Sequence, residues 1–236
     1  MVKTPISLGD EESDRDRLAV KKQPVWVLKL GGSLAHTPYL MNWLDVLAGP
    51  RKINIVVVPG GGDFADQVRT SQRKWKFDEI TAHRMALLAM QQYGLMLASL
   101  SSGFTIAGNL DEIRAAVREK PVTVWLPDVG ELDRAGISSG WEVTSDSLSA
   151  WLAGQIAAER LVIVKSSPRS DLLASPEELA RERILDTAFP EFWKKSGVAL
   201  RIFHSGEYRE FAIELDAALF FDVRTPLMYG NRKNVS

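Results

Sequence analysis

The chain contains no cysteine among its 236 residues. A disulfide framework, a thiolate metal site and a cysteine nucleophile are therefore excluded, and we expect a cytoplasmic protein because this composition fits a reducing compartment. Long apolar runs are also missing: none approaches the roughly 20 residues that span a bilayer, and the first 24 residues lack the apolar core of a secretory signal. We therefore expect no membrane partner.

The chain also has no marked excess of positive or negative charge. The 29 Lys and Arg residues nearly balance 30 Asp and Glu residues, for a net charge of -1, so nothing in the charge indicates a nucleic-acid partner. Residues 9–17 mix both signs without apolar periodicity, which predicts that residues 1–22 are a mobile extension. The remaining composition is ordinary for a globular protein and predicts a single domain over residues 23–230.

Within this domain, apolar β-branched runs alternate with stretches of helical spacing. The runs predict strands at residues 25–30, 53–58, 122–126, 161–165, 201–203 and 219–223, and a short one near Thr105. Helices are predicted at residues 35–48, 63–71, 78–99, 110–119 and 145–158, with a glycine-rich loop at 130–140. In the longest helix, one face is expected to hold Met85, Leu88, Ala89, Gln92 and Met96. This alternation predicts a three-layer αβα sandwich with a mainly parallel open sheet.

Ligands of such sheets gather at the carboxyl ends of strands, and the first strand ends in a distinctive turn. Lys29 is followed by Gly31, Gly32 and Ser33. Glycines let the backbone approach a ligand, a following helix start offers N–H groups to phosphate, and the lysine adds a positive charge. The alternative is a tight turn beside a solvated strand-end lysine.

The second predicted strand ends in three successive glycines, Gly60, Gly61 and Gly62, followed by Asp63. Three glycines form a cradle without side chains, which few small turns need. With Ala65 they also fit the dinucleotide pattern G-x-G-x-x-A, so a nicotinamide-dependent oxidoreductase is an alternative. That alternative leaves the turn after Lys29 unexplained.

A third group of polar residues, Thr144, Ser145, Asp146 and Ser147, precedes a predicted helix. Ser145 or Asp146 could cap the helix, or the carboxylate could lie opposite Lys29 and hold it beside a transferring phosphoryl group. Lys165, at the end of another predicted strand, could supply a second cation.

Other catalytic motifs are absent or lie in the wrong context. No P-loop pattern occurs. Residues 136–140 match G-x-S-x-G, but Ser138 follows a polar segment and not a strand, which argues against a hydrolase. His36, His83 and His204 show no metal-ligand spacing, so no metal site is predicted among them.

Taken together, K-x-G-G-S at residues 29–33, V-x-G-G-G at 58–62 and T-S-D-S at 144–147 resemble the amino acid kinase family. The resemblance covers residues 25 to about 225. It implies an ATP-dependent kinase of a small molecule, with Mg²⁺ as metal cofactor and a homo-oligomeric assembly. It also implies an acceptor-binding half at about residues 23–150 and a nucleotide-binding half at about 151–230.

The resemblance also implies roles for the residues named above. Lys29 would contact the transferring phosphoryl group, with Asp146 orienting it and Lys165 as the second cation. Gly31, Gly32 and Ser33 would bind the ATP phosphates. The acceptor would be bound by Gly60, Gly61, Gly62, Asp63, His83, Thr144 and Ser145. Tyr93 is a further candidate for the substrate pocket.

Residues 78–94 and 141–150 look most like the methanofuran-biosynthesis branch of that family. Kinases of this branch phosphorylate an aminomethylfuran methyl phosphate, a phosphomonoester, to a diphosphate. Bacterial relatives of the branch occur in methylotrophs that make the related compound methylofuran. Acceptors of other family kinases, such as isopentenyl phosphate, UMP or an amino acid, remain alternatives. So does a noncatalytic nucleotide- or metabolite-binding protein, because residues 165–169 (KSSPR) depart from the acidic segment common in the family.

Overall fold

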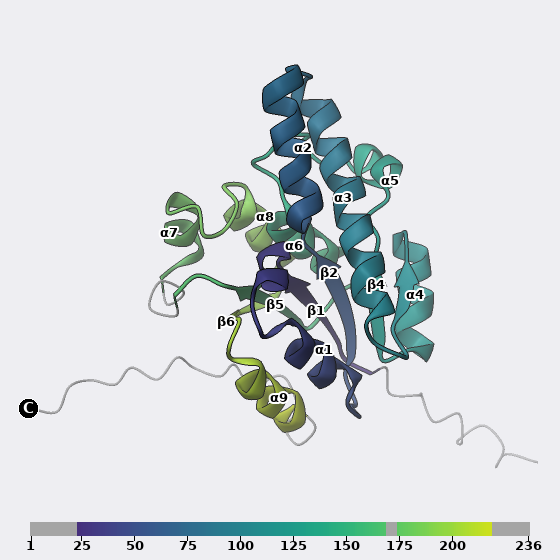
Figure 1. The fold of residues 1–236 in the computed structure, drawn as a ribbon. Coiled ribbons are helices and arrows are strands. Elements are labelled where there is room, and N and C mark those ends of the chain that lie inside the picture. The colour runs from purple at the N-terminus through teal and green to yellow at the C-terminus, as the bar shows by residue number, and fades with distance from the viewer. Residues whose placement is uncertain (1–22, 169–173, 219–236) are drawn as a thin grey trace, which may run out of the picture.

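The computed structural model describes residues 23–168 and 174–218 (Figure 1). The strands within these residues are β1 (Val25–Leu30), β2 (Asn54–Pro59), β3 (Thr105–Ala107), β4 (Val122–Trp125), β5 (Arg160–Lys165) and β6 (Ala199–His204). The helices found there are η1 (Gly32–His36), α1 (Leu40–Ala48), α2 (Gly62–Trp75), α3 (Glu79–Ser99), α4 (Leu110–Glu119), α5 (Val129–Arg134), α6 (Ser145–Gln155), α7 (Pro176–Arg181), α8 (Phe189–Ser196) and α9 (Tyr208–Ala217). Of these, η1 is a 3-10 helix and the others are α-helices.

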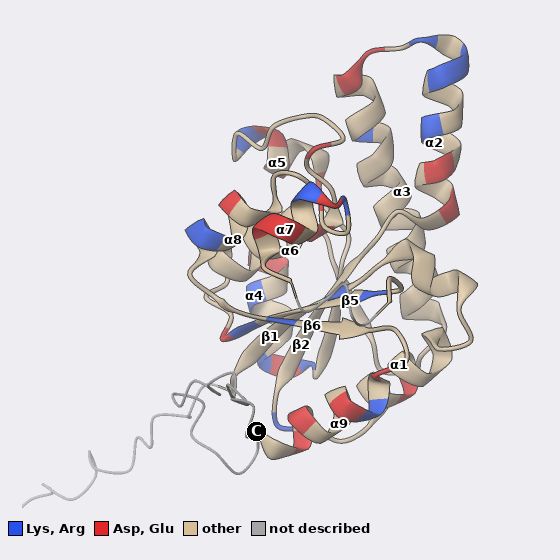
Figure 2. Cartoon of the chain, turned by 90° about the vertical axis from the view of Figure 1, so that its left-hand side faces the viewer, with Lys and Arg blue, Asp and Glu red and all other residues tan. Residues whose placement is uncertain are grey.

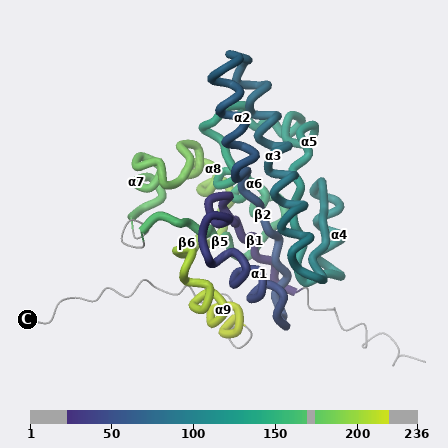
Figure 3. Tube along the Cα trace, viewed as in Figure 1, coloured from purple at the N-terminus to yellow at the C-terminus, as the bar shows by residue number. Residues whose placement is uncertain are grey.

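The described strands form one parallel sheet in the order β3-β4-β2-β1-β5-β6. Every residue of β1 and β2 is buried, which explains their uninterrupted apolar sequences. The chain leaves β1 toward β2 and leaves β5 toward β6, in opposite directions along the sheet (Figure 3). The carboxyl ends of β1 and β5 therefore flank a topological switch point, the usual place for a ligand in an open α/β sheet.

Helices cover both faces of this sheet. Successive strand residues point to opposite faces, so Val27 and Val56 belong to a core shared with α4, α6 and α8. Leu28 and Val57 belong to the other core, shared with α1, α3 and α9. The predicted three-layer αβα sandwich is confirmed. Beyond these layers, α2 and α3 extend together past the carboxyl edge of the sheet (Figure 1).

Several predicted boundaries were wrong. The helix expected at 35–48 is interrupted, because Thr37 is extended and precedes Pro38, which disfavours helical backbone in the residue before it. The loop expected at 130–140 contains α5, whose N-terminus is capped by Asp128 accepting from the Glu131 amide at 2.6 Å. The helix begun at Ser145 ends at Gln155 and does not reach residue 158.

The buried face of α3 also differs from the expected one. Leu88 and Gln92 are exposed, and the side chains that pack inward include Leu87, Met90 and Tyr93. Gly94 accounts for part of the difference: a Cβ there would lie 2.6 Å from the Leu126 side chain, so the helix meets the sheet on its glycine side. Because α3 carries apolar residues around most of its circumference, its sequence alone does not select one face.

Some predictions fall outside the described residues, namely the mobile extension at 1–22 and the strand at 219–223. Within the described part, no helix is both long enough and apolar enough to cross a membrane.

Acidic residues occupy the beginning of α2 and basic residues its end, as Figure 2 shows.

Candidate active site

A carboxylate lies between two lysines at the carboxyl edge of the sheet. Lys29 lies in β1 and Lys165 at the end of β5, and Asp146 comes from the first turn of α6. The Lys29 ammonium lies 2.8 Å from Asp146 Oδ1, and the Lys165 ammonium lies 2.6 Å from Oδ2. The structure thus brings together the three residues predicted to be catalytic.

Burial and charge act in opposite directions on this trio. Burial alone would raise the pKa of Asp146, but the neighbouring Lys165 and Lys29 outweigh it and hold the pKa well below its usual range. Burial lowers the pKa of Lys165, and the charge of Asp146 offsets part of this effect. One fixed carboxylate therefore orients two cations at the switch point.

The two glycine turns pack directly against each other. The Gly60 amide donates to the Leu30 carbonyl at 2.8 Å. A Cβ on Gly32 would lie 2.1 Å from the Gly62 nitrogen, and one on Gly60 would lie 2.3 Å from the Gly32 nitrogen. Any side chain there would force the turns apart, so these glycines serve the contact between strands β1 and β2 as well as any ligand.

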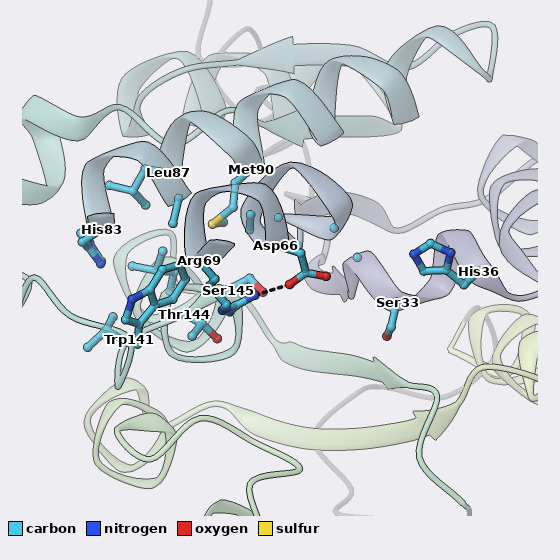
Figure 4. Close-up of a pocket in the computed structure, with 18 residues that line it drawn as sticks. Ser33, His36, Asp66, Arg69, His83, Leu87, Met90, Trp141, Thr144 and Ser145 are labelled. Carbon is cyan, nitrogen blue, oxygen red and sulfur yellow. Dashed lines mark hydrogen bonds and ion pairs between the residues drawn. The ribbon is translucent and has the colours of Figure 1, made fainter. Parts of the chain in front are cut away.

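Two adjoining cavities open beside these turns. The first, here called the helix-side cavity, measures about 290 Å³ and is lined by Gly32, Ser33, His36, Gly60, Gly61, Gly62, Ala65, Asp66, Arg69, His83, Ala86, Leu87, Met90, Trp141, Val143, Thr144, Ser145 and Leu148 (Figure 4). The second, the lysine-side cavity, measures about 660 Å³ and is lined by Lys29, Arg69, Trp141, Glu142, Thr144, Asp146, Lys165, Arg183, Ile184, Leu185, Asp186 and Thr187. They share Arg69, Trp141 and Thr144. Of the predicted site residues, Gly31, Asp63 and the further candidate Tyr93 line neither of these two cavities.

The start of α6 is capped from a distant part of the chain. Neither Ser145 nor Asp146 makes the cap considered from the sequence. Asp186 accepts hydrogen bonds from the Thr144 amide at 2.8 Å, the Thr144 hydroxyl at 2.9 Å and the Ser147 amide at 3.0 Å, and also from the Ser147 hydroxyl. Its own amide donates to Asp146 Oδ2 at 3.3 Å.

Asp186 therefore holds Asp146 in two ways, through the helix start and through its backbone. Burial and the charge of Asp146 raise the pKa of Asp186, while the hydrogen bonds from Ser147 and Thr144 act in the other direction. Sequence reasoning missed this residue, because it lies 40 positions from Asp146 and in no motif.

Asp186→Ala should lower the free energy of unfolding by about 1–3 kcal/mol, because it removes a cap and leaves buried donors without an acceptor. If Asp186 also positions Asp146, turnover should fall as well, whereas Asp186→Asn should keep part of both. Urea unfolding and a kinase assay would measure the two effects. Asp78→Ala is the matched control, since Asp78 caps α3 away from the site. Equal turnover in Asp186→Ala and Asp78→Ala would contradict a positioning role.

Of the histidines, His36 and His83 line the helix-side cavity, whereas Tyr93 does not line it. His83 is buried, its Nδ1 lies 3.2 Å from the Gly140 carbonyl, and burial lowers its pKa, which favours the neutral imidazole. His36 pairs with Asp63 at 2.7 Å on the surface. Tyr93 packs beneath Gly62 and its pKa is raised to about 12 by burial, so its phenol keeps its proton at neutral pH.

The segment after β5 lacks the acidic residues that are common at this place in the family. Its described part contacts the first glycine turn. The Ser166 hydroxyl donates to the Ser33 hydroxyl at 2.9 Å. Arg169 lies outside the described residues. The short polar side chains therefore join the ends of β1 and β5.

The fold and the site together define a parallel α/β protein in which two lysines and two glycine turns lie at the carboxyl edge of the central strands, where open α/β sheets usually bind ligands. Over residues 24–169 the sequence matches the amino acid kinase family. The chain belongs to this family.

Individual relatives agree with this assignment. The [5-(aminomethyl)furan-3-yl]methyl phosphate kinase of Methanocaldococcus jannaschii is 29% identical over 140 residues, which are 58% of this chain and 63% of that protein. The chain thus matches less than two thirds of that relative's length.

Solved structures share the fold at low sequence identity. Uridylate kinase from Archaeoglobus fulgidus gives a TM-score of 0.62 at 18% identity, covering 81% of this chain and 95% of the other. UMP kinase from Bacillus anthracis gives 0.62 at 14% identity, covering 83% and 92%. These likenesses concern the fold alone.

Proposed function

We propose that this protein is an ATP-dependent phosphotransferase that converts a small phosphomonoester to a diphosphate. The carrying observation is the buried arrangement in which Asp146 lies within 2.8 Å of Lys29 and 2.6 Å of Lys165. Phosphoryl transfer depends mainly on positioning and charge neutralisation, and two cations fixed by one carboxylate suit that need. Family membership and the kinase from M. jannaschii support the same reaction type.

The proposed acceptor is aminomethylfuran methyl phosphate, on the pathway to methanofuran or methylofuran. Support comes from the named activity of the relative that is 29% identical. The helix-side cavity also suits a small flat molecule, since its wall combines apolar side chains of α3 and α6 with the indole of Trp141.

In the proposed reaction, an oxygen of the acceptor phosphate attacks the γ-phosphorus of ATP in line. A new P–O bond forms while the bond from the γ-phosphorus to the bridging oxygen breaks, and ADP leaves with that electron pair. Lys29 and Lys165 offset negative charge on the transferring oxygens, and Asp146 holds their positions. A phosphomonoester is largely ionised near neutral pH, so no general base is required.

ATP would occupy the lysine-side cavity, whose wall carries four cationic side chains (Lys29, Arg69, Lys165 and Arg183) against three acidic ones (Glu142, Asp146 and Asp186). The described residues contain no group of three or more His, Cys, Asp or Glu side chains that could hold a metal ion. Asp146 and Asp186 already accept hydrogen bonds or pair with lysine, so the described residues offer Mg²⁺ no set of protein ligands of their own. We propose that Mg²⁺ arrives as Mg-ATP, held mainly by the phosphates.

Phosphorus NMR of the purified protein with Mg-ATP would test the proposal. The acceptor panel contains aminomethylfuran methyl phosphate, isopentenyl phosphate, UMP, glutamate and acetylglutamate. A new diphosphate signal from the furan compound is expected. Transfer to another acceptor would keep the kinase and change its substrate, and ATP binding without any transfer would favour the noncatalytic alternative. The homo-oligomer and the cytoplasmic location stay predictions, the former to be checked by light scattering against the 26.2 kDa chain mass.

A further inference from the structure

We infer that Arg69 receives the phosphate of the acceptor at the junction of the two cavities, with the indole of Trp141 beside it. The acceptor class is thereby a phosphomonoester with a small flat apolar body. This inference rests on the proposed function, because it takes the helix-side cavity as the acceptor's place. Arg69 lies outside the motifs that the sequence singles out, and Trp141 is the first residue of the run 141–150.

The position of Arg69 is the first argument. Arg69 lies on α2 and lines both the helix-side and the lysine-side cavity. An acceptor whose apolar body fills the helix-side cavity must present its nucleophilic oxygen toward Lys29 and Lys165. The group that carries this oxygen then lies at the junction, beside the guanidinium of Arg69.

The second argument is that the guanidinium is already held in place. Its Nη1 donates to Asp66 Oδ1 at 2.7 Å, one turn back on the same helix (Figure 4). Its central carbon lies 4.2 Å from the centre of the Trp141 ring, a cation–π contact. Trp141 is fixed in turn, since its Nε1 donates to Gln72 Oε1 at 2.8 Å. Little ordering is left for a ligand to impose.

The third argument is the capacity that remains. A guanidinium carries five N–H donors, and Asp66 is its acceptor among the residues that the structure describes. The free donors match the oxygens of a phosphate in a planar fork. Asp66 and Trp141 contact the guanidinium, and Arg69 also lines both cavities, where a ligand can meet its remaining donors.

The remaining wall selects the body of the ligand. Apolar side chains of α3 and α6, with Val143, line the helix-side cavity. These side chains are Ala86, Leu87, Met90 and Leu148. A flat ring between them and the indole would bury apolar surface on both faces, while its phosphate lies against Arg69. Isopentenyl phosphate has no flat ring and would fill this space less well.

Binding titration separates this inference from turnover. Phenyl phosphate serves as a flat phosphomonoester and benzoate as a carboxylate with the same ring, each titrated by calorimetry with a nonhydrolysable ATP analogue and Mg²⁺ present. Arg69→Gln should weaken phenyl phosphate binding by roughly tenfold to a hundredfold, and Arg69→Lys by less. Arg73→Gln is the matched control, because Arg73 lies one turn later on α2 and lines neither cavity. In Arg69→Gln the affinity for the ATP analogue should fall less than the affinity for phenyl phosphate, although Arg69 also lines the lysine-side cavity. In Arg73→Gln both affinities should stay unchanged.

Several outcomes would overturn the inference: no binding of phenyl phosphate by the unaltered protein, equal binding in Arg69→Gln, an equal loss for benzoate, or a loss confined to the ATP analogue. The proposed function fails separately. If phenyl phosphate binding depends on Arg69 but phosphorus NMR detects no transfer to any acceptor, the phosphate site stands and the kinase does not. If transfer occurs while the affinity for phenyl phosphate does not depend on Arg69, the kinase activity stands and this phosphate site does not.

Discussion

Lys29→Ala should lower the turnover number by about a hundredfold to a thousandfold, the usual cost of removing one fixed group that stabilises transition-state charge. The ammonium of Lys29 is buried and held 2.8 Å from Asp146, so no mobile lysine can take its place. Turnover should fall far more than stability, because Asp146 keeps Lys165 as a partner at 2.6 Å. Steady-state kinetics with saturating Mg-ATP, together with a urea unfolding curve, would measure both.

Lys195→Ala provides the comparison for this variant. Lys195 pairs with Glu191 at 2.7 Å on the exposed surface of α8, and such pairs contribute little to stability. Both its turnover and its unfolding midpoint should match those of the unaltered protein. Unchanged turnover in Lys29→Ala would remove the catalytic assignment of the trio, even if ATP still bound.

The strands and their turns could be predicted because they are local features. A buried parallel strand must be apolar on both faces, so β1 and β2 stand out in the sequence, and each is followed directly by glycine. The meaning of the glycines was only partly predictable. Gly32 and Gly60 leave no room for side chains because the two turns touch. This contact depends on the pairing of β1 with β2, which the sequence of either turn does not show.

Residues that act across long sequence separations escaped the sequence reasoning. Asp186 follows no recognisable pattern, and its value comes from the path that brings it back to the start of α6. Arg69 looks like an ordinary surface residue of an amphipathic helix until Trp141, 72 positions later, is found against it. Lys29, Asp146 and Lys165 were predictable because each lies at a strand end or helix start, where the topology of an α/β sheet directs ligands.

Asp146→Asn should destabilise the fold more than the loss of either lysine, by about 3–5 kcal/mol at neutral pH. The change leaves two buried ammonium groups without the carboxylate that they share, and only the weaker influence of Asp186 on Lys165 remains. Lys165 can relieve part of this penalty by releasing its proton, since burial already lowers its pKa. Urea unfolding would measure the effect. Asp133→Asn is the control, because Asp133 pairs with Arg84 at 2.8 Å on the surface and its loss should cost little.

The difference in stability between the unaltered protein and Asp146→Asn should depend on pH. In the fold the pKa of Asp146 is held below its ordinary value of 3.8, so its ionised form is favoured by folding. That contribution is complete above pH 3.8 and is lost as the pH falls through the lower pKa of the folded state. The two proteins should therefore differ most at pH 7 and progressively less below pH 3.8. A difference that stays constant from neutral to acidic pH would contradict this prediction, because it would mean that the charge of Asp146 does not contribute to stability.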